Sequence, residues 1–352
     1  MLVKNPFEKS DSMKIAIHHR PSGFSNHWIS YCEKHNVPHK LVNCYNSNIM
    51  QELDDCDALM WHFHQTHHKD VLFAKELIYS VQASGKKVFP DFHTAWHFDD
   101  KVGQKYLLEA TGAPLVSSYV FYDKKEALHW VDTTEFPKVF KLRKGAGSAQ
   151  VRLVRSKEDA RRRIKKAFGR GFSQYDSGSN LKERWRLFRS GQTNLWNVLK
   201  GIVRLGYTTE FDRVAGNEKG YVYFQDFVPG NSSDTRVIVI NEKAFAIKRI
   251  VRENDFRASG SGDIEYAKGL FDEETVRLAF DLADKLKCQS LALDFVYKDG
   301  RPMIVEVSFG YTCEVYEPCE GYWDREMNWH SGSFNPQHWM VETLLDEDRV
   351  QT

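Results

Sequence analysis

The sequence that decides the fold is LALDFVYKDGRPMIVEVSFG, residues 291–310. Two apolar segments flank the turn Lys298-Asp299-Gly300, whose glycine supplies the positive φ that a tight hairpin needs. Each segment carries one acid among apolar neighbours, Asp294 on the first and Glu306 on the second. Because carboxylates are seldom buried without a partner, the two acids indicate an oxygen-donor site.

Ser308 extends this site, since it lies two residues beyond Glu306 and therefore on the same face of the strand. Oxygen donors in small number suit Mg²⁺, which keeps part of its water shell and takes further ligands from phosphates. The hairpin thus predicts a magnesium site made by Asp294, Glu306 and Ser308. A surface hairpin whose acids face water is the alternative that this stretch alone leaves open.

The composition is that of a globular chain with balanced charge. Of the 352 residues, 41% are hydrophobic and 28% charged, and 49 basic side chains oppose 48 acidic ones for a net charge of +1. This balance gives no reason to expect nucleic acid as a partner. No apolar run approaches the roughly 18 residues of a membrane helix, and the N-terminus lacks the apolar core of a secretory signal. The six cysteines include no C-x-x-C pair, so we expect neither zinc nor disulfides, and a cytoplasmic protein without a membrane partner.

Residues 14–98 alternate between strand and helix patterns. Short apolar runs at 14–19, 39–43, 57–62 and 87–90 predict strands, and residues 25–34 and 69–83 have the spacing of helices. This order implies a parallel sheet covered on both faces.

Histidines are densest directly after the third of these strands, at His62, His64, His67 and His68. Their spacing matches no metal motif that we recognise, but they follow a strand end, where parallel α/β sheets place their ligand crevice. Metal ligation, substrate contact and an ordinary polar loop all stay open, as they do for His93 and His97.

The next segment combines a lysine in an apolar strand with a glycine-rich turn. A helix is expected over 99–110, strands over 115–120 and 136–142, and a helix over 124–131. Lys141 lies between Phe140 and Leu142, which is unusual unless its amine finds an anion. The turn at 143–149 and a strand at 150–154 then indicate a flap whose backbone N–H groups face phosphate oxygens.

Residues 157–220 are less informative. A basic helix at 157–170 has either a solvated face or a surface for an acidic substrate, and both interpretations stay open. Residues 173–180 and 212–220 are expected to be loops, and residues 181–205 a helix interrupted at Ser190-Gly191.

Order returns with strands at 220–230, 233–240 and 244–251, which we expect to form one antiparallel meander. Three cations on these strands, Arg236, Lys248 and Arg249, and two more just beyond, Arg252 and Arg257, favour a concave anion site over scattered surface charge. An amphipathic helix at 272–287 leads into the hairpin.

Seven motifs in this order resemble the ATP-grasp superfamily, most closely the branch of the ribosomal-protein glutamate ligases and glutathione synthetases. They are Asp100-Lys101, Lys141, Gly145-Ala-Gly-Ser148, Gln225-Asp-Phe-Val-Pro-Gly230, Asp234-Thr-Arg236, Ala246-Ile-Lys-Arg249 and Asp294…Glu306-Val-Ser308. The resemblance implies an α/β fold of the ATP-grasp type in three parts. These are an N-terminal parallel α/β (pre-grasp) domain over 1–98, a central lobe with the flap over 99–222 and a C-terminal lobe with the metal hairpin over 223–352. The two α+β lobes would clasp ATP.

The resemblance also implies roles for individual residues. The residues it implies for ATP are Lys101, Lys141, Gly145, Gly147, Ser148, Gln225, Asp226, Phe227, Val228 and Asp234. Magnesium would be held by Asp294, Glu306 and Ser308, and Arg236, Arg249 and Arg257 would neutralise an acyl phosphate and the substrate carboxylate. Two positions depart from the family: Ser308 replaces an asparagine, and Gln225 replaces an acid. The insert between the glycine-rich turn and the strand at 220–230 is also long.

The implied activity is that of an ATP-dependent carboxylate–amine ligase, which forms an amide through an acyl phosphate. Its cofactors would be ATP and Mg²⁺, and its substrates a small-molecule carboxylate and amine, of sugar or amino-acid type. An ATP-grasp kinase and a nucleotide-binding module without turnover are the alternatives, and a homodimer stays open. The aromatic tail from Tyr311 to Met340 either lines the substrate pocket or packs onto the core, and residues 337–345 should close the chain as a helix.

Overall fold

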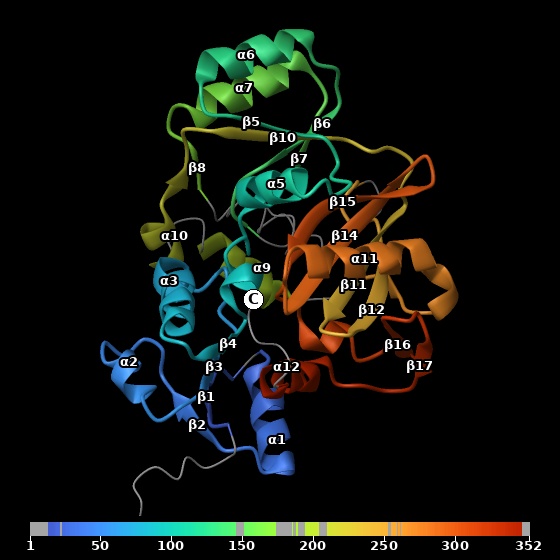
Figure 1. Ribbon diagram of the computed structural model, residues 1–352. Helices are drawn as coiled ribbons and strands as arrows, with labels where there is room; N and C mark the ends of the chain where they lie inside the picture. Colours follow the sequence, from blue (N-terminus) through green and yellow to red (C-terminus); the bar gives the residue numbers. More distant parts are fainter. Residues whose placement is uncertain are drawn as a thin grey trace, which may run out of the picture.

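The computed structural model describes residues 13–21, 23–145, 151–173, 194–203, 210–252, 255–258 and 262–346, together with residues 185, 188 and 260. Figure 1 shows three regions, each with its own sheet: the N-terminal domain, a central lobe and a C-terminal lobe. None of the helices in the described part of the chain combines the length and the apolarity that crossing a bilayer requires.

The N-terminal domain has the parallel sheet that the sequence predicted. Its strands run in the order β2 (His39–Val42), β1 (Ile15–His18), β3 (Ala58–Met60) and β4 (Lys87–Phe89). Ile15 and Ile17 pack on the side of α1 (Ser25–His35), whereas Ala16 and Leu59 pack on the side of α3 (Asp70–Ala83). Because neighbouring residues of a strand point to opposite faces, this alternation places one helix on each face. Two short helices, α2 (Ile49–Glu52) and α4 (Phe92–Ala95), were not predicted.

The central lobe is an antiparallel sheet in the order β5 (Ser118–Phe121), β10 (Val222–Asp226), β6 (Lys138–Lys141) and β7 (Arg152–Val154). Its apolar face packs on α6 (Lys124–Thr133) and α7 (Lys157–Ala167). The expected single meander over 220–251 is therefore wrong in its first strand, because β10 pairs with β5 and β6. The boundary that we placed between residues 222 and 223 consequently falls inside β10.

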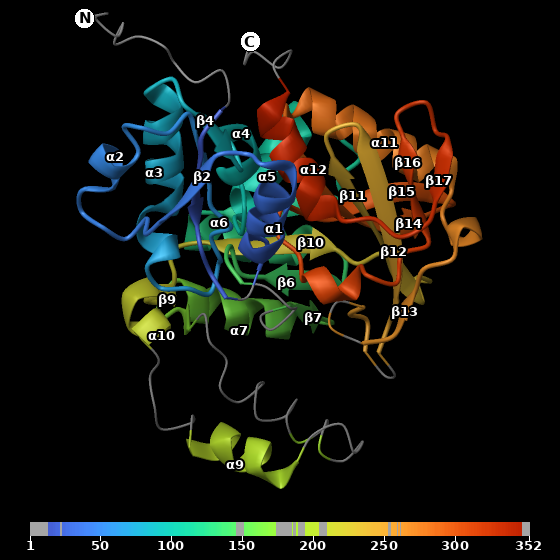
Figure 2. The ribbon, with the colours of Figure 1, turned by 90° about the horizontal axis from the view of Figure 1, so that it is seen from below.

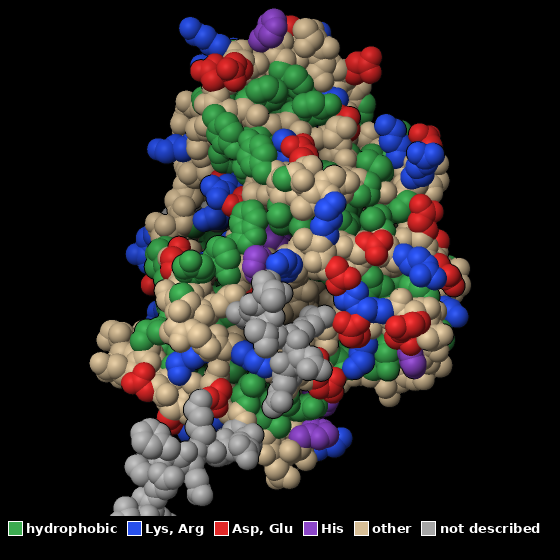
Figure 3. Space-filling model, in the orientation of Figure 1, with side chains coloured by type: hydrophobic (Ala, Val, Ile, Leu, Met, Phe, Trp, Pro, Cys, Tyr) green, Lys and Arg blue, Asp and Glu red, His purple; other side chains and the backbone are tan. Residues whose placement is uncertain are grey.

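The basic helix α7 forms several ion pairs. Arg161 pairs with Asp132 at the end of α6, and Arg162 pairs with Asp159 at 3.3 Å. These exposed contacts agree with a solvated face. Figure 3 likewise shows acidic and basic side chains interspersed over the visible surface.

The C-terminal lobe contains the hairpin that opened the sequence analysis. Its sheet runs β15 (Arg301–Ser308), β14 (Ser290–Lys298), β11 (Ser233–Ile240), β12 (Lys243–Ile250), β16 (Gly321–Asp324) and β17 (Trp329–Ser331), and β13 (Ile264–Glu265) pairs with β12. Asp299 and Gly300 both have positive φ, at 53° and 77°, as a tight hairpin turn requires. Helix α11 (Glu273–Lys285) covers one face of this sheet. The short turn η1 (Lys268–Leu270) precedes α11 in the sequence, and η2 (Cys313–Val315) follows β15.

The rest of the chain corrects one expected loop. Residues 212–220 contain the end of helix α10 (Glu210–Ala215) and strand β9 (Asn217–Glu218), which pairs with β8 (Phe172–Ser173). Within the expected helix at 181–205, the structure has α9 (Leu195–Val203), which lies apart from the three sheets in Figure 2.

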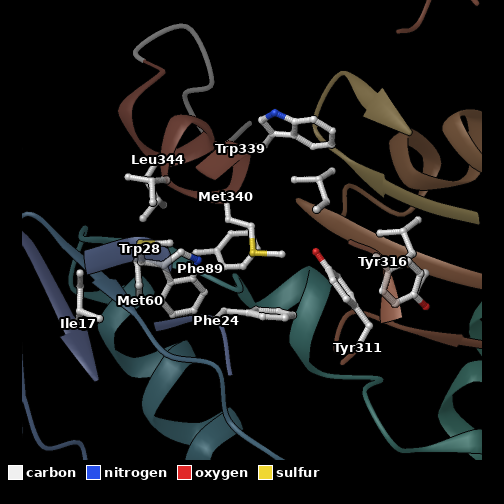
Figure 4. Close-up of a cluster of buried hydrophobic side chains, with 14 of the residues drawn as sticks. Ile17, Phe24, Trp28, Met60, Phe89, Tyr311, Tyr316, Trp339, Met340 and Leu344 are labelled. Carbon is white, nitrogen blue, oxygen red and sulfur yellow. The ribbon is translucent and has the colours of Figure 1, made fainter. Parts of the chain in front are cut away.

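One apolar core joins the N-terminal domain to the C-terminal lobe and the tail. Helix α12 (Pro336–Leu345) inserts Trp339, Met340 and Leu344 between the two regions. They pack with Trp28 and Phe89 of the N-terminal domain (Figure 4). Full burial of one large apolar side chain stabilises a fold by roughly 1.5–3 kcal/mol, so this cluster holds the N-terminal domain firmly against the C-terminal lobe.

Candidate active site

Two cavities meet at the carboxylates of the hairpin. The larger has a volume of about 740 Å³ and lies between the N-terminal domain and the C-terminal lobe. The smaller, of about 140 Å³, lies between the central and C-terminal lobes. Asp294 and Glu306 line both cavities, and they face each other as a registered pair of β14 and β15. The two acids singled out by the sequence therefore stand at the junction of the two spaces.

Asp294 is held by two arginines. Arg236 forms a two-pronged contact, with Nε 2.5 Å from Oδ1 and Nη2 2.7 Å from Oδ2, and Nη2 of Arg249 lies 2.9 Å from Oδ2. Burial opposes ionisation of Asp294, but these guanidinium groups prevail and hold its pKa well below the usual range.

Arg249 also makes a two-pronged contact with Asp234, at 2.6 and 2.7 Å. Asp234 faces Arg249, and Arg236 faces Asp294, as registered neighbours on adjacent strands. Burial raises the pKa of Asp234 despite its arginine partner. The structure thus brings two carboxylates and two guanidinium groups, predicted on three strands, into one buried network.

Two buried lysines approach the hairpin from the central lobe. Nζ of Lys101 lies 3.0 Å from Oε1 of Glu306 and donates to the carbonyl of Gly145 at 2.8 Å. Lys141 donates to Oε1 of Gln225 at 2.7 Å and to the carbonyl of Val305 at 3.2 Å. Burial lowers the pKa of Lys141 to about 8. Among the described residues, no carboxylate lies within hydrogen-bonding distance of Lys141. Its amine is therefore available to an anionic ligand.

The two residues that precede helix α5 (Lys101–Ala110) form hydrogen bonds to the first residues of the glycine-rich turn. Asp99 accepts a hydrogen bond from the N–H of Gly145 at 2.8 Å, and Asp100 binds the guanidinium of Arg143 at 2.9 and 2.5 Å. Asp99 has φ of 52°, and burial raises its pKa to about 6. Its role was not predicted, because only the fold brings residue 99 to residue 145. Gly147 and Ser148 lie outside the described residues.

Five of the residues that the resemblance implies for ATP line the smaller cavity beside Lys141. They are Gln225, Asp226, Phe227, Val228 and Asp234. Gln225 accepts from Lys141 and donates to the hydroxyl of Ser118 at 3.1 Å, so both ends of its amide are engaged. Asp226 binds Nζ of Lys138 at 2.5 Å.

Arg257 is placed differently from the other two arginines. It lines the smaller cavity and pairs with Asp255, with Nη2 2.5 Å from Oδ2. Arg257 thus lines a different cavity from Arg236 and Arg249, and its expected place beside a substrate carboxylate stays a prediction.

The donor set is compatible with magnesium through two carboxylates. Asp294 and Glu306 face the same junction, and Mg²⁺ needs few protein oxygens because water and phosphate complete its shell. Ser308 lines the larger cavity, but its hydroxyl donates to the carbonyl of Gly310 at 3.1 Å and accepts from its N–H at 3.2 Å. Within the described part of the chain, no group of three or more His, Cys, Asp or Glu side chains is arranged to hold a metal.

Two histidines of the cluster line a cavity, and the other two contact acidic side chains. His62 and His64 line the larger cavity. His67 instead binds Asp70 at 2.9 Å, and His68 approaches Glu210 at 3.4 Å. His97 is buried, with Nε2 3.8 Å from Sγ of Cys288.

The aromatic tail is divided in the same way. Residues 311–316 line the larger cavity, whereas Trp323 and Trp339 are buried in hydrophobic cores. Part of the tail therefore packs onto the core, as one interpretation predicted, and part lines the larger cavity; that this cavity holds the substrate stays a prediction. Arg20, a further residue of the cavity wall, was not singled out from the sequence.

Comparison with known proteins gives the same fold. Residues 210–318 match the family described as the RimK-like ATP-grasp domain. A RimK domain ATP-grasp protein from Sphaerobacter thermophilus superposes with a TM-score of 0.54 and 14% identity, covering 95% of this chain and 100% of that one. D-alanine–D-alanine ligase from Bacillus anthracis, complexed with ATP, gives 0.54 and 12%, covering 96% and 98%. The biotin carboxylase domain of 2-oxoglutarate carboxylase from Hydrogenobacter thermophilus gives 0.58 and 12%, covering 97% and 71%.

A search of the curated proteins returned no match. The fold is nevertheless clear from the match over residues 210–318 and from the structural similarity along nearly the whole chain. Residues 210–318 of this chain match the RimK-like ATP-grasp domain, and the chain has the fold of the ATP-grasp superfamily.

Proposed function

We propose that this protein is an ATP-dependent carboxylate–amine ligase that forms an amide bond through an acyl phosphate. The observation that carries the proposal is the junction of the two cavities at Asp294 and Glu306. A nucleotide in the smaller cavity would direct its phosphates toward this junction, and an acid in the larger cavity would meet them there. The similarity in fold to an ATP-bound D-alanine–D-alanine ligase agrees with this proposal.

The chemistry explains why the junction is rich in cations. A carboxylate is a poor electrophile, because its leaving group would be oxide. Attack of a carboxylate oxygen on the γ-phosphorus forms a C–O–P link and releases ADP. The amine then attacks the carbonyl carbon, the C–O bond breaks with release of phosphate, and the amine loses a proton. Such phosphoryl transfer depends mainly on positioning and on neutralising negative charge.

The residues of the junction divide this work. Lys101 and Lys141 would bind phosphate oxygens, and Arg236 and Arg249 would hold the substrate carboxylate and its acyl phosphate. In the present arrangement both arginines are engaged by Asp294. Asp294 and Glu306 would hold Mg²⁺, which would supply charge neutralisation at the phosphates when bound.

The test is ADP release from Mg-ATP across a panel of carboxylates, with and without hydroxylamine. A carboxylate that triggers ADP release and yields a hydroxamate supports an acyl phosphate and names the acid. ADP release with a phosphorylated alcohol and no hydroxamate would show a kinase instead. ATP binding without ADP release from any acid or alcohol would favour the nucleotide-binding module.

A further inference from the structure

We infer that Arg20, His62 and His64 form a recognition wall for an oxyanion, so that the acid substrate carries a second anionic oxygen group remote from the carboxylate that is activated. This inference rests on the proposed function, which places the reacting carboxylate at the other end of the same cavity. All three residues belong to the N-terminal domain, and all three line the larger cavity with Arg236 and Arg249.

His62 is fixed as a hydrogen-bond donor toward the cavity. Its Nδ1 accepts the backbone N–H of Phe24 at 3.2 Å, and its ring stacks on that of Phe24 with centroids 3.7 Å apart. Burial lowers the pKa of His62 to about 3, so the ring is neutral at pH 7. A neutral imidazole carries one proton, which must then be on Nε2. This nitrogen lies near Gly310, since a Cβ added to that glycine would be 3.5 Å away.

His64 is fixed in the same tautomer. Its Nδ1 accepts the backbone N–H of Thr66 at 3.2 Å and lies 2.8 Å from the Thr66 hydroxyl. Burial again lowers the pKa, so the proton of the neutral ring is on Nε2. Neither Nε2 atom has a hydrogen-bond partner within the described residues.

Arg20 adds a positive charge to these two neutral donors. Its backbone is held by Ser25, which accepts its N–H at 3.0 Å and donates to its carbonyl at 2.9 Å. The nearest carboxylate is Asp70, 3.9 Å from Nη1, which is beyond hydrogen-bond distance.

Asp70 is already engaged by other donors. It accepts from the hydroxyl of Tyr45 at 2.6 Å, from the N–H of His64 at 2.7 Å, and lies 2.9 Å from Nδ1 of His67. Asp70 therefore positions the loop that carries His64, and leaves the charge of Arg20 largely available.

The recognition wall thus presents the guanidinium of Arg20 and the Nε2–H groups of His62 and His64 to the cavity. A ligand with several oxygen acceptors would match these donors. The positive charge of Arg20 makes an oxyanion, a carboxylate or a phosphate, a better match than a carbonyl or a hydroxyl. The acids that line the cavity, Asp99, Asp294, Glu306 and Glu314, belong to other segments, and Asp294 and Glu306 already have cationic partners.

The experiment measures binding, which does not depend on turnover. Calorimetry with the full chain, Mg²⁺ and a non-hydrolysable ATP analogue would compare straight-chain monoacids of four to seven carbons with the diacids and ω-phosphono acids of equal length. At the best length, a diacid or phosphono acid should bind roughly tenfold or more tightly than its monoacid, as one charge-assisted hydrogen bond implies. Which of the two binds better distinguishes carboxylate from phosphate.

Variants then assign the effect to the wall. Arg20→Ala should remove the preference for the second anion, and His64→Phe should weaken it by a few-fold, whereas His64→Gln, which keeps a donor near the position of Nε2, should retain it. His68→Gln is the matched control, because His68 is on the same loop but does not line the cavity. Equal affinity for all acids, no binding by any of them, or an unchanged preference in Arg20→Ala would overturn the inference.

The same samples with ATP separate the two proposals. A preference for the second anion without ADP release would leave the wall in place and refute the ligase. ADP release without such a preference would support the ligase and refute the wall.

Discussion

The buried amine of Lys141 gives the sharpest test of how the site is prepared for ATP. Its pKa falls from 10.5 to about 8 because burial penalises the ammonium form. One pKa unit is equivalent to about 1.4 kcal/mol, so at pH 7 the folded protein without ATP loses roughly 3 kcal/mol of stability to this one charge.

The sign of the pH dependence follows from proton binding. Between pH 8 and 10.5 the unfolded chain binds more protons at Lys141 than the folded chain does, so stability from this group rises with pH. About 2 kcal/mol of the penalty should be gone by pH 9.5. Lys141→Met removes the charge and keeps the apolar stem, although it also leaves the acceptors on Gln225 and Val305 without their donor, at about 1 kcal/mol each.

The assay is chemical unfolding of wild type and Lys141→Met, without nucleotide, at pH 7 and pH 9.5. At pH 7 the unfolding free energy of the variant should exceed that of wild type by about 1 kcal/mol. Between pH 7 and pH 9.5 this difference should shift by about 2 kcal/mol toward wild type, so that wild type becomes the more stable protein. Lys138→Met, on the same strand, is the control: it removes a pair with Asp226 and should destabilise the protein at pH 7. A difference between wild type and Lys141→Met that does not change with pH would refute the reasoning.

ATP should reverse this balance, because phosphate oxygens favour the ammonium form of Lys141. At pH 8, where Lys141 is about half protonated without ligand, ATP binding should take up about half a proton, measurable by calorimetry in buffers of different ionisation enthalpy. Lys141→Met should abolish this uptake and weaken ATP binding.

Three further predictions concern the hairpin, the base of the flap and the edge of the large sheet. Glu306→Gln should lower ADP release by roughly 100-fold or more while the circular dichroism spectrum is retained; full activity would remove Glu306 from the proposed magnesium site. Asp99 has a raised pKa of about 6, so its ionisation makes stability fall as pH rises from about 4 to 6, and Asp99→Asn should lack this fall in thermal melts. Gly321→Ala would place Cβ 2.3 Å from the carbonyl of His330 and should lower the melting temperature by several degrees, whereas Gly269→Ala, with open space around it, should not.

Sequence and structure agree where local pattern decides the outcome. The alternation of β1 to β4 with helices, the helix α5 near its expected bounds of 99–110 and the tight turn at Asp299-Gly300 all follow from residue types and short spacing. The same holds for the two acids of the hairpin, because an acid inside an apolar strand already signals a partner.

The sequence failed where pairing between distant segments decides. Strand β10 reads as the first strand of a meander, yet it pairs with β5 and β6, about 100 and 80 residues earlier. Short strands have no sequence signal for their partner, since register depends on burial in the assembled sheet. The adjacent strands β11 and β12, by contrast, pair as expected.

By itself, the sequence determined the order of the motifs, the chemical character of the site and the strands that carry its acids, because these depend on residue type and on neighbours in the chain. Only the tertiary structure decided that Lys141 meets Gln225, 84 residues away, and that Asp294 is shared by Arg236 and Arg249. It also decided that His62 and His64 of the N-terminal domain line the same cavity as the hairpin. The physical reason is that hydrogen bonds, burial and charge act through space, and segments far apart in sequence become neighbours only when the apolar cores between them have formed.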